Sequence, residues 1–302
     1  GTPLNREPDF IIEICGALMS NLKPDSVIAC LDCPNHVQAV LDASMWASIR
    51  LQAPIGLLHS VPSLQQKAAV DYSGCLNIDD ENVLLDQFTA KEHLSNSELK
   101  AQGKLLLHQA STYCEQQHHK LKTYTLHRHE SLSDSIDYVD DKAQLMVIGH
   151  HVTCKSTLSQ LIRLSHCPIL VTHAPFLPPT TALFAFDNSP TSHKLLNWLC
   201  KTPLIRALTV HIVMVAKENS ENCDALREAY ARLKQAGIKC KKALLDCRDV
   251  TAALNYYQSK NDIGLLMTGA FGQPRLLELL KGSETKKLLG STKTPYLLFP
   301  KA

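Results

Sequence analysis

Three glycines and one serine near the carboxyl end of the chain have a spacing that could hold the phosphates of a ligand. An apolar run at 264–268 is short enough to be a buried strand, and Gly269 ends it. Two residues separate Gly269 from Gly272, and nine separate Gly272 from Gly282, which Ser283 follows at the start of a helical stretch. Glycines let backbone amides approach an anion closely, and a helix N-terminus favours negative charge. The pattern therefore predicts a phosphate-binding loop.

The loop spacing is neither that of a Walker loop nor that of a dinucleotide fingerprint with three closely spaced glycines. The pattern G-x2-G-x9-G-[ST], after a strand and before a helix, resembles the nucleotide-binding motif of the universal stress protein family. In an alternative interpretation Gly269 and Gly272 only shape a turn, but the spacing of Gly282 and Ser283 favours ligand binding. Glu284 departs from the family pattern, and its carboxylate would weaken triphosphate binding more than adenosine binding.

The resemblance implies two further contacts with a nucleotide, at Asp187 and Val215. In open α/β sheets, ligands bind beyond the carboxyl ends of the strands, and both residues lie at predicted strand ends. Asp187 can accept hydrogen bonds from ribose hydroxyls or an adenine amino group, and Val215 offers an apolar wall. The local alternative is that 187–190 is only a turn, with Ser189 capping a helix and Pro190 in its first turn. The predicted nucleotide-binding residues are Asp187, Val215, Gly269, Gly272, Gly282 and Ser283.

Length and composition limit the class of protein. A chain of 302 residues suggests about two domains, and 45% apolar with 20% charged residues is ordinary for a globular protein. A net charge of +2 gives no electrostatic reason to expect nucleic acid or an anionic membrane as a partner. Apolar stretches are interrupted well before the ~20 residues of a membrane span, and the start lacks a signal-peptide pattern. Eleven scattered cysteines are typical of reduced thiols, so we expect a cytoplasmic protein.

The order of predicted strands repeats along the chain. Apolar strands at 27–31 and 183–186 lead into Asp32 and Asp187 respectively. The later strands correspond in pairs, which are 54–61 with 208–215, 144–149 with 263–269, and 167–171 with 294–299. Strands that alternate with helices predict parallel α/β sheets with right-handed crossovers. We therefore expect two tandem, open parallel-sheet α/β domains.

Prolines at 175, 178 and 179 mark the boundary between the two expected domains, because three prolines so close together exclude helix and central strand. The expected division is an N-terminal helical extension at 1–24, a first domain at 25–173 with an insertion at 62–103, a linker at 174–181 and a second domain at 182–302. The resemblance implies the universal stress protein fold, which is adenine nucleotide α-hydrolase-like, with the domains paired through their last strands. The chain would then be an intramolecular pseudo-dimer, favoured by the effective concentration that fusion creates. A further homodimer stays open.

The first unit has a degenerate copy of the glycine motif. Gly149 ends the corresponding strand, but the loop after it is shorter and Lys155 stands where the late glycine should be. We therefore expect no nucleotide of the family type there, and a polar or plugged cleft is favoured. An alternative is a zinc site made from cysteine and histidine near the strand ends. Its candidate ligands are Cys33, His129, His150, His151 and Cys154.

The resemblance and the residues together favour a stress-response protein that binds ATP, ADP or AMP in its second domain and acts as a sensor or regulator. The second cleft shows no candidate general base, acidic metal-binding pair or activated nucleophile, so turnover is not expected. Slow ATP hydrolysis, which needs only a positioned water and magnesium, stays open. The alternative function class is a scaffold, or a protein that binds another small ligand, without nucleotide. A nucleotidyl transferase of related architecture is disfavoured, because no His-x-x-His or Ser-Gly-Gly signature follows the first strand.

Overall fold

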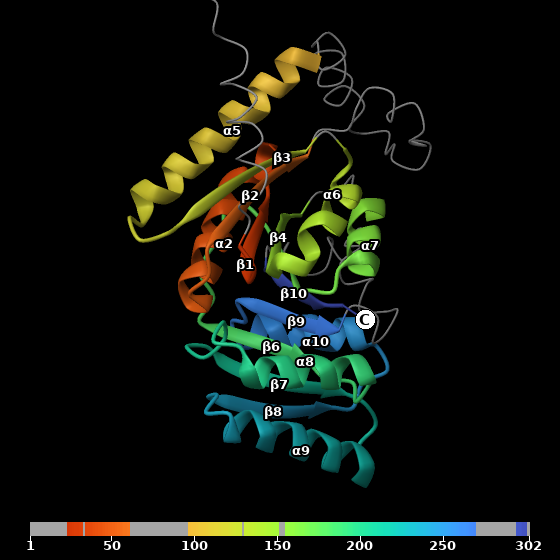
Figure 1. Ribbon diagram of the computed structural model, residues 1–302. Coiled ribbons are helices and arrows are strands. Elements are labelled where there is room, and N and C mark those ends of the chain that lie inside the picture. Colours follow the sequence, from red (N-terminus) through yellow and green to blue (C-terminus); the bar gives the residue numbers. More distant parts are fainter. Residues whose placement is uncertain are drawn as a thin grey trace, which may run out of the picture.

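The computed structural model describes residues 23–32, 34–60, 96–128, 130–150, 155–269 and 294–300 (Figure 1). Within these ranges ten strands form one sheet in the order β3-β2-β1-β4-β5-β10-β9-β6-β7-β8. The strands of the first half are β1 (Ser26–Cys30), β2 (Ile55–Ser60), β3 (Thr123–Arg128), β4 (Ala143–Gly149) and β5 (Ile169–Thr172). The strands of the second half are β6 (Thr181–Ala185), β7 (Thr209–Val215), β8 (Cys240–Leu245), β9 (Leu265–Gly269) and β10 (Tyr296–Phe299).

The two halves repeat one topology and meet at their last strands. Each half begins on its central strand, moves outward through two parallel strands, and then returns to the other side of the first strand. Strands β5 and β10 pair antiparallel, with Leu170 opposite Leu297, whereas the other strand pairs of the sheet are parallel. Both leucines are fully buried, so the core is continuous across the junction. The predicted α/β fold and the pairing through the last strands are confirmed.

Helices cover both faces of the sheet, as Figure 1 shows. One face is covered by α2 (Val37–Leu51), α5 (Asn96–Gln117), α8 (Pro190–Lys201) and α9 (Ser220–Gln235). The other face is covered by α6 (Leu132–Val139), α7 (Lys155–Leu164) and α10 (Val250–Lys260). Short 3-10 turns occur at Pro34–His36 and Asp140–Lys142. Alternate residues of β1 enter opposite cores, with Val27 on the first face and Ile28 on the second, as expected for a strand buried on both sides.

Side-chain caps place several helix starts directly after strands. Ser189 accepts a hydrogen bond from the backbone N–H of Ser192, and Pro190 occupies the first turn of α8, as the sequence predicts. Asn219 and Asp249 cap α9 and α10 in the same manner. Caps of this kind stabilise a helix by about 1 kcal/mol each. They fix the points at which the second half turns from strand to helix.

Some expectations fall on residues outside the described ranges. These are residues 1–22 of the helical extension expected at 1–24, residues 62–95 of the expected insertion, and the chain between 270 and 293. The remainder of the insertion, 96–103, belongs to the long helix α5. Among the described helices, none combines the length and the apolar character that crossing a bilayer requires.

His211 is a buried base in the core of the second half. Its side chain, on β7, is 3% exposed, and its Nδ1 atom lies 3.2 Å from the hydroxyl oxygen of Tyr257 on α10. Burial lowers the pKa of His211, and the charge of Lys241 lowers it further. The hydroxyl can donate to Nδ1 only while that nitrogen is unprotonated.

The free energy of unfolding is therefore expected to fall as the pH decreases below about 6.5, the ordinary pKa of histidine. In that range the unfolded chain binds more protons than the folded chain, so stability rises with pH and is lost as His211 protonates. Replacing the pair with apolar residues, His211→Leu with Tyr257→Phe, should flatten the slope between pH 7 and pH 5, measured by urea denaturation. His108→Ala, at an exposed position of α5, is the control. Equal slopes in the wild type and the double variant would contradict this prediction.

Candidate functional site

Three of the predicted nucleotide-binding residues meet at one edge of the sheet. Asp187 follows β6 by two residues, Val215 ends β7 and Gly269 ends β9. Strand β6 lies between β9 and β7 and is parallel to both, so the carboxyl ends of all three strands share an edge. The other predicted residues, Gly272, Gly282 and Ser283, lie outside the described residues. The structure thus brings together the described part of the predicted site.

This edge contains the topological switch of the second half. From β6 the chain moves outward to β7 and β8, and it then crosses to β9 on the opposite side of β6. The strands that follow β6 and β9 in the chain, β7 and β10, therefore lie on opposite sides of this pair, and α/β sheets of this type bind ligands at such a switch in strand order. Asp187 follows β6 and Gly269 ends β9.

Asp187 lies in a tight turn between β6 and α8. Its Oδ1 atom accepts a hydrogen bond of 3.1 Å from the backbone N–H of Ser189. Asn188 adopts a left-handed backbone conformation with φ of 60°, and the Asp187 side chain is half-buried. The bond to Ser189 uses one of the two carboxylate oxygens. A carboxylate ordered in this way can accept hydrogen bonds from a ligand at the strand edge.

Gly269 is required by packing as well as by the predicted loop. A Cβ atom at this position would lie 2.7 Å from Cγ2 of Thr191 and 3.2 Å from its Cβ. Thr191 is buried in the first turn of α8, so the glycine lets this helix approach the end of β9. The structure therefore supplies a reason for this glycine that the sequence pattern did not contain.

Val215 is half-buried at the end of β7, and its neighbour Ala216 donates from its N–H to the carbonyl of Leu245. The valine side chain lies on the face of the sheet that α6, α7 and α10 cover, where it packs against the buried apolar residues of that face. This position matches an apolar wall beside the turn of Asp187. Ala185 of β6 lies opposite Val213 of β7, so Asp187 and Val215, each two residues later, follow neighbouring strand positions.

The equivalent positions in the first half are Asp32, Ser60 and Gly149, because Cys30 lies opposite Leu58 as Ala185 lies opposite Val213. Here the aspartate has a different partner. Oδ1 of Asp32 accepts a 2.9 Å hydrogen bond from the backbone N–H of Ser60, and the same oxygen lies 3.6 Å from Nδ1 of His59. The carboxylate is thus engaged with the end of the neighbouring strand.

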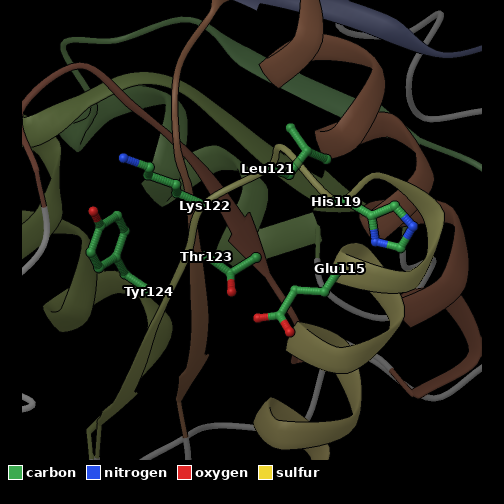
Figure 2. Close-up of a pocket in the computed structure, with 6 residues that line it drawn as sticks. All are labelled: Glu115, His119, Leu121, Lys122, Thr123 and Tyr124. Atoms are coloured by element: carbon green, nitrogen blue, oxygen red, sulfur yellow. The ribbon is translucent and has the colours of Figure 1, made fainter.

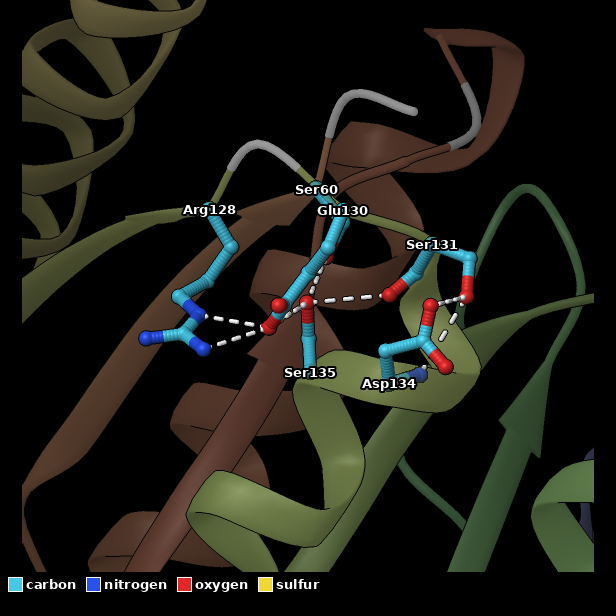
Figure 3. A network of polar contacts seen from close by, with 6 residues as sticks. All are labelled: Ser60, Arg128, Glu130, Ser131, Asp134 and Ser135. Atoms are coloured by element: carbon cyan, nitrogen blue, oxygen red, sulfur yellow. Dashed lines mark hydrogen bonds and ion pairs between the residues drawn. The ribbon is translucent and has the colours of Figure 1, made fainter. Parts of the chain in front are cut away.

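A polar network joins β2, β3 and α6 beside this first aspartate (Figure 3). Ser60 donates to the hydroxyl of buried Ser135 over 3.1 Å, and Ser135 donates to Oε1 of Glu130 over 3.3 Å. Arg128 donates through Nε to the same carboxylate oxygen at 2.7 Å. Ser60 occupies the position that Val215 has in the second half. It is therefore a hydrogen-bonded polar group, whereas its counterpart is apolar.

His36 covers the strand-end glycine of the first half. It occupies the position four residues after Asp32, as Thr191 stands four residues after Asp187. A Cβ atom on Gly149 would lie 2.5 Å from Cβ of His36, so the larger histidine side chain begins directly against the glycine. Both strand-end glycines are thus packed by the residue four positions after the aspartate, and the two edges differ in the partner of the aspartate.

Of the candidate zinc ligands, His150 lies in the described chain, whereas Cys33, His129, His151 and Cys154 lie outside it. The ring of His150 stacks on that of His173 at 4.3 Å, and Tyr296 of β10 meets both rings edge-on. The described residues contain no group of three or more histidine, cysteine or acidic side chains that could hold a metal ion. The zinc hypothesis receives no support from these residues.

A separate pocket of about 490 Å³ lies where α5 ends and β3 begins (Figure 2). Its lining residues are Glu115, His119, Leu121, Lys122, Thr123 and Tyr124. Because it borders the start of β3, it is at the opposite edge from the strand ends described above. Nothing in the sequence pattern pointed to it, and its polar lining is open to solvent.

Comparisons with known proteins show that the chain is similar to universal stress proteins in sequence and in fold. No family model matches the chain. The universal stress protein Slr1230 of Synechocystis is 28% identical over 286 residues, which is 91% of this chain and 99% of that protein. A universal stress protein from Archaeoglobus fulgidus has a solved structure with TM-score 0.63 at 13% identity, covering 94% of this chain and 98% of that chain. A putative universal stress protein from Pseudomonas aeruginosa gives TM-score 0.54 at 14% identity, covering 94% and 95%.

Proposed function

The chain belongs to the universal stress protein family, and from this premise we propose that its second half binds an adenine nucleotide, ATP, ADP or AMP. The observation that carries the proposal is the position of Asp187 and Gly269 on either side of a topological switch, where open α/β sheets bind ligands. Val215 borders the same edge. The glycine spacing after β9 adds the sequence signal for phosphate.

Each residue has a defined part in this proposal. The Asp187 carboxylate accepts from the ribose hydroxyls or the adenine amino group, and Val215 packs against the base. Amides at Gly269, Gly272 and Gly282, together with the Ser283 hydroxyl, bind the phosphates with or without magnesium. The proposed site thus offers a carboxylate to polar hydrogens, an apolar wall to the base and amides to the anion.

The same proposal includes the division of the chain. The repeated strand order supports two domains at 25–173 and 182–302 with a linker at 174–181. In the first domain Asp32 accepts a hydrogen bond from Ser60 on the neighbouring strand, whereas Asp187 bonds within its own turn, and this difference supports a structural role for the first domain. One domain that binds nucleotide, fixed through the β5–β10 pair to one that does not, suits a sensor or regulator.

Calorimetric titration with ATP, ADP and AMP at millimolar concentration tests the function, and saturable binding is expected. The repeat supplies a matched pair of variants. Asp187→Ala should weaken binding about tenfold, because a charged hydrogen-bond acceptor for the ligand is lost. Asp32→Ala should leave the affinity unchanged and lower the melting temperature, because it removes the acceptor for the Ser60 amide.

Absence of saturation with all three nucleotides would reject the proposal. Equal loss of affinity in the two aspartate variants would instead place the nucleotide at both edges or at neither, and it would reject the assignment to the second half. The non-nucleotide scaffold is the second candidate function. The internally bonded first cleft favours it for that half, and it would be left as the function of the whole chain if titration fails.

A further inference from the structure

We propose that His193 is a positioning residue that holds the turn at Asn188 and thereby aims the Asp187 carboxylate at the ligand. This inference rests on the proposed nucleotide site. It concerns a side chain on α8 that the family motif does not contain. The positioning depends on the backbone conformation of Asn188, the contacts of the His193 ring and the hydrogen bond of Asp187.

Asn188 has an unusual backbone conformation for a residue with a side chain. Its φ of 60° lies in the left-handed region, which asparagine tolerates better than most residues but which glycine adopts more easily. The residue is exposed and stands directly between Asp187 and Ser189. A change in this one backbone angle would therefore swing the Asp187 side chain relative to the start of α8.

His193 bonds to the side chain of that residue. Its Nε2 atom lies 2.8 Å from Oδ1 of Asn188, and an amide oxygen only accepts, so the ring N–H donates. The ring is fixed from a second side by Phe186, which it meets edge-on with centroids 5.3 Å apart. Phe186 is 1% exposed and belongs to the core, so His193 links the turn to a rigid part of the molecule.

The hydrogen bond of Asp187 completes the arrangement. Its Oδ1 accepts from the N–H of Ser189, the residue after Asn188, so the carboxylate keeps its direction only while the turn keeps its shape. The chain of contacts runs from the buried Phe186 through His193 and Asn188 to the carboxylate. Ordering of a ligand-binding group before the ligand arrives reduces the entropy lost on binding.

Among the described residues of the first half, the counterpart of His193 bonds elsewhere. The residue six positions after Asp32 is Gln38, in the place of His193 after Asp187. The Nε2 atom of Gln38 donates to Asp42 over 3.0 Å and also bonds to Tyr113, so it serves α2 and α5 and not the turn. Asp32 there accepts from Ser60 on the next strand. The bond from this helix position to the turn is thus found beside Asp187, the aspartate of the proposed ligand site.

The test uses the full chain and four variants, His193→Ala, His193→Gln, Asn188→Gly and the double variant Asn188→Gly with His193→Ala. Calorimetry with ATP reads affinity, and residue-resolved amide exchange by NMR reads the Ser189 N–H in the absence of nucleotide. His193→Ala should weaken ATP binding about fivefold, or about 1 kcal/mol, and speed exchange at Ser189. His193→Gln should keep affinity and Ser189 exchange close to those of the wild type, because the glutamine amide also donates a hydrogen bond.

Asn188→Gly gives the decisive comparison. Glycine adopts the turn without help from a side chain, so removing His193 in this background should change neither Ser189 exchange nor affinity by more than about twofold. A histidine with a merely structural role would change affinity and Ser189 exchange equally in both backgrounds. His108→Ala, on the exposed side of α5, controls for loss of an imidazole and should leave both readouts unchanged.

The outcomes separate the two claims. If the wild type binds no ATP, the proposed function fails, while exchange at Ser189 still reports on the positioning role. If the wild type binds ATP and His193→Ala binds it equally well with unchanged exchange, the positioning role is overturned and the nucleotide site stands. An equal effect of His193→Ala in the Asn188→Gly background would also overturn it.

Discussion

Gly272→Asp is expected to abolish adenine-nucleotide binding while the protein stays folded. The residue is the second glycine of the predicted phosphate loop, three positions after the strand-end Gly269. A carboxylate placed about 4 Å from a phosphate charge costs about 4 kcal/mol at an effective dielectric of 20. That energy corresponds to about a thousandfold loss of affinity, which would remove measurable binding from a site of modest strength.

The matched control is Ala231→Asp, which adds the same charge to the exposed side of α9. Residue 231 lies in the later part of α9, a helix that starts after β7 and runs back toward the opposite edge of the sheet. It should bind ATP like the wild type. Calorimetry gives the affinity, and circular dichroism with a thermal scan establishes that both variants fold. Retained binding by folded Gly272→Asp would show that the loop does not hold the phosphates.

Gly103→Ala is expected to destabilise the first half by about 1–3 kcal/mol, the usual cost of overpacking a core. In most helices the same change stabilises by about 1 kcal/mol, because alanine has the higher helix propensity. Here the new Cβ would lie 2.4 Å from Nε2 of His127 and 2.8 Å from Cδ2 of His59. These two rings stack at 5.5 Å with an interplanar angle of 13°, and Gly103 of α5 lies against the stack. The sign of the effect is therefore reversed.

Urea denaturation of the full chain measures the change in unfolding free energy. Gln102→Ala, at the adjacent exposed position of α5, should change it by less than about 0.5 kcal/mol. Removing the ring in the double variant Gly103→Ala with His127→Ala should show a favourable coupling, since the added methyl group then has space. A stabilising Gly103→Ala would mean that α5 does not approach the histidine pair as closely as described.

The repeated alternation of strands and helices could be predicted from the sequence because it depends on local patterns. Short apolar runs predicted the buried strands, and the cap at Ser189 appears as predicted. The pairing of β5 with β10 came from the family resemblance and is confirmed by the register of Leu170 with Leu297. Strand ends also placed Asp187, Val215 and Gly269 at a common edge, since parallel strands have the same direction.

Only the tertiary structure decided how these strand-end groups are used, because their partners are distant in the sequence. Asp32 and Asp187 follow equivalent strands, yet one bonds to Ser60, 28 residues away, and the other to its own turn. Spacing cannot distinguish the two, because a carboxylate takes the direction set by its spatial neighbours. Gly269 is a second example. The sequence identified it as a loop glycine, and only the fold shows that it is also needed for packing against Thr191.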